Sequence, residues 1–168
     1  MKNSLLKLVI SLTIAGSTFV GCKEDKKDDD TAVLALLLLA TQSGGGCNVT
    51  INSASGNIAS IAASSTEQKL SGSASGSSKL GIVTVSGIAA NKKVVFKNAN
   101  SVSISAYQGT CPINLGSATS ASSNFTTSTS GTTTSYTVSS LGSTNGNFVF
   151  FITATSSVFD AITVSITD

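Results

Sequence analysis

Three cysteines carry the most reactive side chains of this chain, and their spacing limits the chemistry they can do. They are Cys22, Cys47 and Cys111, in a sequence of 168 residues without histidine or tryptophan. No two of them form a Cys-x-x-Cys pair, and without histidine neither a Cys–His nucleophile nor a mixed Cys/His metal site can form. We therefore expect structural roles for these thiols, as attachment points or as a disulfide.

Carboxylates are too few for paired acid–base catalysis. Five of the eight acidic residues lie within residues 23–30, which leaves Glu67, Asp160 and Asp168 for the rest of the chain. A two-carboxylate mechanism and a calcium site both need more oxygen ligands than this. The Gly44 to Gly46 run lacks the lysine of a phosphate loop and is typical of a linker. We expect no enzyme activity, no metal site and no cofactor.

One small basic cluster, Lys92, Lys93 and Lys97, has two interpretations. It can be a solvated turn, or it can contact an anionic ligand such as a glycan or a lipid headgroup. Nucleic-acid binding is not expected, because all ten basic residues are lysine and aromatic stacking partners are scarce.

The first 21 residues have the layout of a secretory signal peptide. Lys2 and Lys7 supply a positive start, and residues 8–15 form a short apolar run followed by small residues. Ser11 and Thr13 interrupt this run, which is too short for a membrane-spanning helix.

The residues that follow, Phe19-Val20-Gly21-Cys22, resemble the lipobox of bacterial lipoproteins. Phe19 replaces the usual leucine, which is similar to the relaxed lipoboxes of spirochaete lipoproteins. The resemblance covers only residues 1–22. It implies that Cys22 is acylated, for example with palmitate, and becomes the mature N-terminus. This predicts a protein anchored to a lipid bilayer in the cell envelope, with the outer membrane favoured over the inner one. The alternative is an ordinary signal peptide followed by an incidental cysteine.

Residues 22–46 read as a tether. A hydrated charge run, KEDKKDDD, precedes the apolar stretch AVLALLLLA at residues 32–40. Acids before this stretch and glycines after it predict a short helix. Nine residues span only about 14 Å, too little to cross a bilayer. This helix could pack on the domain, lie on lipid or contact another subunit; its apolar side chains are Val33, Leu34, Leu36, Leu37, Leu38 and Leu39.

Residues 47–168 show the period-two alternation of β-strands. Residues 47–51, 102–106 and 162–166 alternate apolar with polar side chains, whereas residues 148–152 are apolar throughout, as in a strand covered on both faces. Short strands separated by Ser, Thr, Gly and Asn predict an antiparallel β-sandwich, immunoglobulin-like or Greek-key. A β-solenoid is the alternative, although no constant repeat is visible.

Local signals within this domain give finer predictions. Asn145-Gly146 predicts a hairpin between the strands at Tyr136 and Phe148. Residues 53–78 and 117–134 read as loops or edge strands, and within the first stretch the spacing of apolar residues from Ile58 to Lys69 is compatible with a brief helix.

Export permits oxidation, so Cys47 and Cys111 are expected to form a disulfide that encloses 63 residues. Together these features predict a membrane-anchored, non-catalytic binding or adhesion module for a protein or glycan ligand. The alternative is a structural envelope lipoprotein that assembles through its apolar helix.

Overall fold

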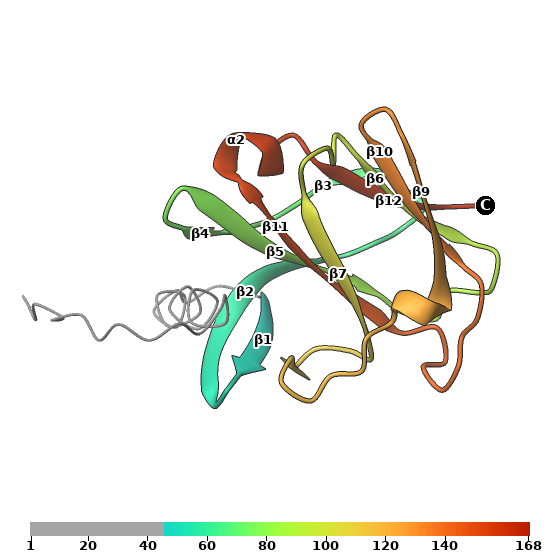
Figure 1. The fold of residues 1–168 in the computed structure, drawn as a ribbon, viewed down its shortest axis with the longest axis horizontal. Coiled ribbons are helices and arrows are strands. Elements are labelled where there is room, and N and C mark those ends of the chain that lie inside the picture. Colours follow the sequence, from blue (N-terminus) through green and yellow to red (C-terminus); the bar gives the residue numbers. More distant parts are fainter. Residues whose placement is uncertain (1–45) are drawn as a thin grey trace, which may run out of the picture.

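The computed structural model describes residues 46–168, which fold mainly into β-strands (Figure 1). The strands are β1 (Gly46–Ile51), β2 (Ala54–Ala62), β3 (Gln68–Lys69), β4 (Ser73–Ser75), β5 (Ser78–Val85), β6 (Lys93–Lys97), β7 (Ser103–Gln108), β8 (Ile113–Asn114), β9 (Phe125–Ser130), β10 (Thr133–Val138), β11 (Phe148–Thr155) and β12 (Thr163–Thr167). A 3₁₀ turn, η1 (Ser122–Asn124), and a short helix, α2 (Ser156–Phe159), complete this part of the chain. The predicted all-β class is confirmed. Cys22 and the predicted helix at residues 32–40 lie outside the described residues.

The larger sheet has seven strands in the order β7-β11-β5-β2-β1-β8, with β4 pairing beside β5. Most neighbours are antiparallel, but β2 pairs with β5, and β1 with β8, in parallel. The expectation of a purely antiparallel fold was wrong at these two pairs. Between β2 and β5 the chain visits the other sheet as β3, and such a crossover is what a parallel pair requires.

Chain connectivity forces this larger sheet to curl into a half-barrel. The edge strands β7 and β8 are joined only by residues 109–112. Six strands laid flat would separate the outer two by about 24 Å. The chain from Gln108 to Ile113 reaches at most about 18 Å. The two edges must therefore approach each other.

The smaller sheet has five strands, all antiparallel, in the order β3-β12-β6-β10-β9. Register places Val94 between Tyr136 and Ile166, with all three side chains on the inner face. The next residue, Val95, lies between Ser135 and Ser165 on the opposite face. Alternation along each strand thus gives this sheet one apolar and one polar face.

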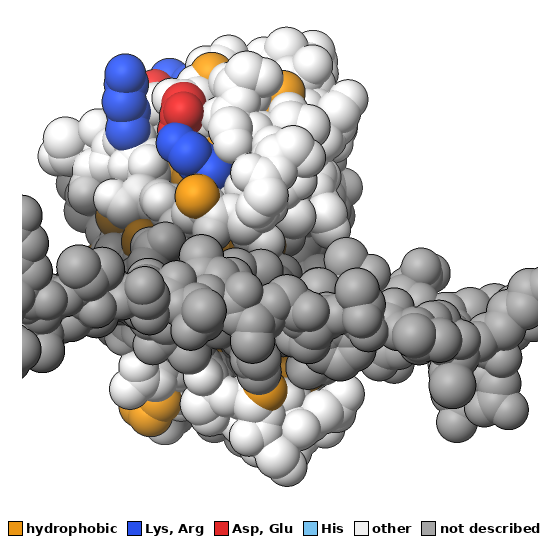
Figure 2. Space-filling model, turned by 90° about the vertical axis from the view of Figure 1, so that its left-hand side faces the viewer, with side chains coloured by type: hydrophobic (Ala, Val, Ile, Leu, Met, Phe, Trp, Pro, Cys, Tyr) orange, Lys and Arg blue, Asp and Glu red, His pale blue; other side chains and the backbone are white. Residues whose placement is uncertain are grey.

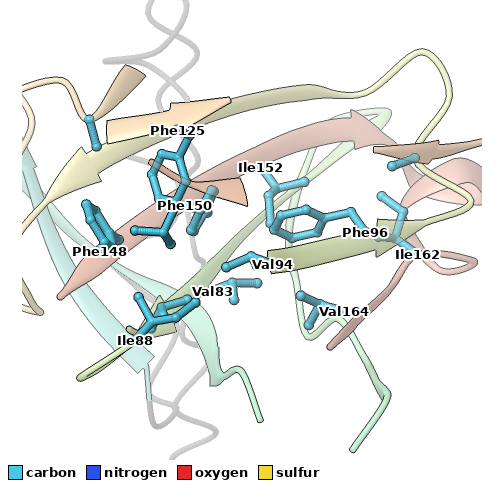
Figure 3. Packing of buried hydrophobic residues seen from close by; sticks show 14 of the residues in the cluster. Val83, Ile88, Val94, Phe96, Phe125, Phe148, Phe150, Ile152, Ile162 and Val164 are labelled. Carbon is cyan, nitrogen blue, oxygen red and sulfur yellow. The ribbon is translucent and has the colours of Figure 1, made fainter. Parts of the chain in front are cut away.

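The main hydrophobic core draws on both sheets. Val94, Phe96 and Val164 of the smaller sheet pack in one cluster with Phe148 and Phe150 of the larger sheet (Figure 3). A second cluster, which includes Cys47, Val49, Ile82 and Val149, occupies the other face of the curled sheet. Strand β11 contributes to both clusters, so the prediction that residues 148–152 are covered on both faces is confirmed.

Two glycines without side chains, Gly72 and Gly81, leave room for α2 to pack against the larger sheet. Phe159 of α2 is fully buried, and its ring lies where a side chain at Gly72 or Gly81 would be. A Cβ atom built on Gly72 would lie 2.5 Å from Cε1 of Phe159, and one on Gly81 would lie 2.7 Å from the Ser71 carbonyl oxygen. Glycine is thus required by space at both positions.

Two local predictions were wrong. The brief helix expected from Ile58 is absent, because residues 54–62 form β2; Ile58 and Ile61 belong to different clusters on the two faces of the strand, which produced the helix-like spacing. Asn145 and Gly146 do adopt positive φ angles, 52° and 77°, but their turn carries the chain from one sheet to the other. No hairpin forms there, because β10 already pairs with β6 and β9. Strand β9 is an edge strand, as expected for residues 117–134, whereas β2 lies between β5 and β1, so the same expectation for residues 53–78 was wrong there.

Candidate functional site

A groove of about 320 Å³ opens between the two sheets where their edge strands β7 and β9 face each other without pairing. We call it the β7/β9 groove. It is lined by apolar and hydroxyl-bearing residues that are distant in sequence, among them Ile104, Tyr107, Ser120, Phe125, Thr127 and Tyr136. Tyr107 also packs against the second hydrophobic cluster, on the other face of β7 from Ile104. In Figure 1, β7 runs across the front of the molecule and the β9–β10 hairpin lies to its right.

Aromatic packing fixes the floor of the groove. The Tyr136 ring meets Phe125 edge-on, with ring centroids 5.8 Å apart, and meets Phe150 at 5.2 Å. Figure 3 shows Phe125 and Phe150 side by side in the core beneath. Burial raises the pKa of Tyr136 above its ordinary value, and no charged neighbour contributes to this shift. The phenol is therefore neutral at physiological pH.

Backbone hydrogen bonds hold the loop that forms the rim. The Gln108 amide N–H donates to the Thr119 carbonyl oxygen over 2.9 Å, and the Ala121 N–H donates to the Ala106 carbonyl oxygen over 2.8 Å. These bonds fasten the loop to the C-terminal half of β7. The N-terminal half of β7, around Ile104, makes no such bonds to the loop and lies beside the groove.

The buried Asn124 side chain links β7 to the segment that follows β10. Its Oδ1 accepts a hydrogen bond from Nε2 of Gln108 over 3.0 Å, and its Nδ2 donates to the Ser140 carbonyl oxygen over 3.0 Å. Because Asn124 directly precedes β9, these bonds fix where Phe125 and Thr127 begin to line the groove.

The groove lies in an uncharged part of the chain. No Asp, Glu or Lys occurs between Lys97 and Asp160, a stretch that contains every residue lining the groove. On the face that Figure 2 presents, the charged side chains of the described residues gather near the top, and most of the remaining described surface is neither charged nor hydrophobic.

Acidic side chains pair with two of the three lysines of the predicted basic cluster, Lys92 and Lys97. Lys92 forms an ion pair with Asp168, and Nζ of Lys93 donates to the Asp168 backbone oxygen over 2.8 Å. Lys97 pairs with Glu67 over 2.5 Å. These hydrogen bonds lower the carboxyl pKa values, chiefly through Lys92 for Asp168 and Lys97 for Glu67.

A second hollow, of about 340 Å³, lies beside this cluster and includes Lys92, Ile88, Ile166 and Asp168. Lys93 and Lys97 do not line it. An anion there would compete with the Asp168 carboxylate for Lys92, so this hollow offers weaker electrostatic attraction than the sequence suggests.

The two cysteines of the domain are joined as predicted. Cys47 in β1 and Cys111 after β7 form a disulfide, with their Cα atoms 5.4 Å apart. Among residues 46–168 no group of three potential metal-ligating side chains occurs, and no helix there is long and apolar enough to cross a membrane.

Sequence reasoning did not identify the β7/β9 groove. Tyr107 and Tyr136, the two tyrosines of the chain, both line it. Their scarcity was a usable signal, but they belong to different sheets, and the sequence contains nothing that shows they meet.

Comparison with protein families, curated proteins and solved structures finds no match to this chain.

Proposed function

We propose that this chain is an exported lipoprotein, anchored to an envelope membrane through acylated Cys22, whose β domain is a non-catalytic binding or adhesion module. The β7/β9 groove is the observation that carries the binding role. The groove is concave, it is lined by aromatic residues and several hydroxyl-bearing residues, and most of these residues lie on paired strands. Ligand sites usually have this composition.

We also propose that the two sheets form a β-sandwich of Greek-key or immunoglobulin-like type. The main cluster supports this interpretation, since it combines Phe96 and Val164 of the smaller sheet with Phe148 and Phe150 of the larger one. Such a scaffold suits binding, because it presents edge strands and loops on a rigid base.

The anchor is tested by comparing the full chain with its Cys22→Ala variant. We expect the parent protein, expressed in bacteria, to enter the detergent phase of a two-phase extraction and to carry an acyl mass on Cys22. The variant should stay in the aqueous phase. An unmodified Cys22 in membrane-extracted protein would contradict the proposal.

The location of the domain is tested by treating intact cells with protease, with permeabilised cells and a known periplasmic protein as controls. Digestion on intact cells indicates a surface domain and favours adhesion. Protection until permeabilisation indicates a periplasmic domain and favours a partner within the envelope.

The binding role is tested with two matched substitutions on β9. Thr127 lines the groove, whereas its neighbour Thr126 is also exposed but lies on the other face of the strand. Full-length protein on beads is incubated with envelope fragments and with extracellular matrix. We expect retention by the parent and Thr126→Val, and reduced retention by Thr127→Val. Equal behaviour of all three would contradict a groove-based role.

Retention that instead requires Leu36, tested as Leu36→Asp, would favour assembly through the apolar segment.

A further inference from the structure

We propose that the ligand of the β7/β9 groove is a neutral saccharide. This inference rests on the proposed binding role and specifies its ligand class. It follows from the absence of charged residues among the described residues that line the groove, from the pairing of aromatic and hydroxyl side chains in its walls, and from the partial closure of the β7 edge.

Charge is the first argument. The groove residues come from residues 104–136, within the stretch from Asn98 to Phe159 that contains no charged side chain. A charged ligand would lose hydration on entry and find no opposite charge among the described residues that line the groove. Burial alone raises the pKa of Tyr136, which agrees with an electrically neutral surrounding. The groove thus complements an uncharged molecule.

The side-chain chemistry is the second argument. Ser120 and Thr127 lie exposed on the groove walls. The Thr127 hydroxyl can both donate and accept a hydrogen bond, whereas the Ser120 hydroxyl, which donates to Ser122 Oγ and accepts from the Ser122 N–H, can still accept one more. Sugar hydroxyls have the same dual capacity, so the two sets can satisfy each other. The apolar C–H groups of a sugar ring can pack against Ile104 and against the aromatic rings of Phe125 and Tyr136, which line the same groove. A volume of about 320 Å³ suits a short saccharide unit.

The main chain of β7 is the third argument, because a free strand edge could instead recruit an extended peptide. Strand addition gains its affinity from a continuous row of backbone hydrogen bonds. The rim loop already occupies the Ala106 carbonyl oxygen and the Gln108 N–H. Tyr107 is also bridged to Ser120. Only the first part of the edge strand remains, which favours recognition by side chains.

Intrinsic tyrosine fluorescence provides a direct measurement, because the chain has two tyrosines, both at the groove, and no tryptophan. Full-length protein in detergent is titrated with glucose, galactose, mannose and N-acetylglucosamine, and with their di- and trisaccharides, to about 20 mM. A sulfated disaccharide of matched size is the charged control. We expect a saturable change with at least one neutral sugar and none with the sulfated one. Because no charges pair, the affinity should not fall between about 50 and 500 mM salt.

The β9 pair locates the site. Thr127→Val should weaken the sugar about threefold or more through loss of a hydrogen bond, while Thr126→Val should leave the affinity unchanged. Calorimetry confirms both values independently of fluorescence. No saturable response to any sugar of the panel, preference for the sulfated sugar, or equal effects of the two substitutions would overturn the inference.

The two proposals fail in different ways. If no sugar binds but Thr127→Val still abolishes retention of envelope or matrix material, the ligand is of another class and the binding role stands. If Thr127→Val changes neither measurement, the binding role itself is wrong.

Discussion

Removing the Cys47–Cys111 disulfide should destabilise the domain by about 4 kcal/mol. The cross-link spans 64 positions of sequence, and closing a loop of this length in the unfolded chain is worth about 4 kcal/mol by the chain-entropy relation. A domain of this size is usually stable by about 5–15 kcal/mol, so the loss is a large fraction of the total. The perturbation is the double change Cys47→Ala and Cys111→Ala, which avoids placing a hydroxyl at the fully buried position 47.

The measurement is urea unfolding, followed by circular dichroism, in a Cys22→Ala background so that no third thiol can exchange. Two quantities should move together. The free energy of unfolding should fall, and its dependence on urea should become steeper, because the unfolded chain without the cross-link exposes more surface. Reduced parent protein serves as the control and should match the double variant. A loss below about 1 kcal/mol with an unchanged slope would refute the loop-closure reasoning.

Three further perturbations test the packing and the charges. Gly81→Ala should destabilise the domain by about 1–3 kcal/mol in urea unfolding, because the added methyl group overlaps the Phe159 ring; an unchanged or higher stability would show that the ring can move aside. The hydrogen bond from Lys97 is the main cause of the lowered pKa of Glu67. The contribution of this carboxylate to stability is therefore present above the ordinary carboxyl pKa and is lost as the pH falls. Between about pH 6 and pH 3 the free energy of unfolding should drop less in Glu67→Gln than in the parent, and identical pH profiles would contradict this. Burial raises the pKa of Tyr136, so its stabilising contribution is full below the ordinary phenol pKa and is lost as the pH rises through the higher folded-state value. An absorbance titration of protein whose other tyrosine is phenylalanine should give a midpoint above 10.0, and a midpoint at or below that value would disprove burial of the phenol.

Strand positions followed from the sequence wherever one face of a strand is buried. Residues 162–166 alternate cleanly, and all but the first of them lie in β12, while the continuous apolar run at Phe148 correctly indicated burial on both faces. Periodicity gave the wrong element at β2, because Ile58 and Ile61 lie on opposite faces of the strand, and both are apolar because both faces are covered. Their spacing of three therefore looks helical. It also gave no information on which sheet a strand joins, as the Asn145-Gly146 turn shows.

The candidate site was less predictable than the fold. Cys47 and Cys111 could be paired from their number and from the expected export, and the structure joins them. The lysine cluster was visible in the sequence, but its acidic partner Asp168 lies more than seventy residues away and meets Lys92 only through the fold. The β7/β9 groove depends on two sheet edges that fail to pair, which no local pattern encodes.

The disulfide also determines how the domain responds to mechanical force. The chain enters β1 at Gly46, and β1 and β2 are joined at their far end by a hairpin, so tension on the residues before Gly46 would separate the two strands one residue pair at a time. The bond at Cys47 stops this separation after the first pair and transfers the tension to Cys111. Tyr107 at the groove lies four positions before Cys111 in the sequence. A pull on the N-terminal segment thus reaches β7, one wall of the groove, through the covalent bond at Cys47, without separating β1 from β2 beyond their first residue pair.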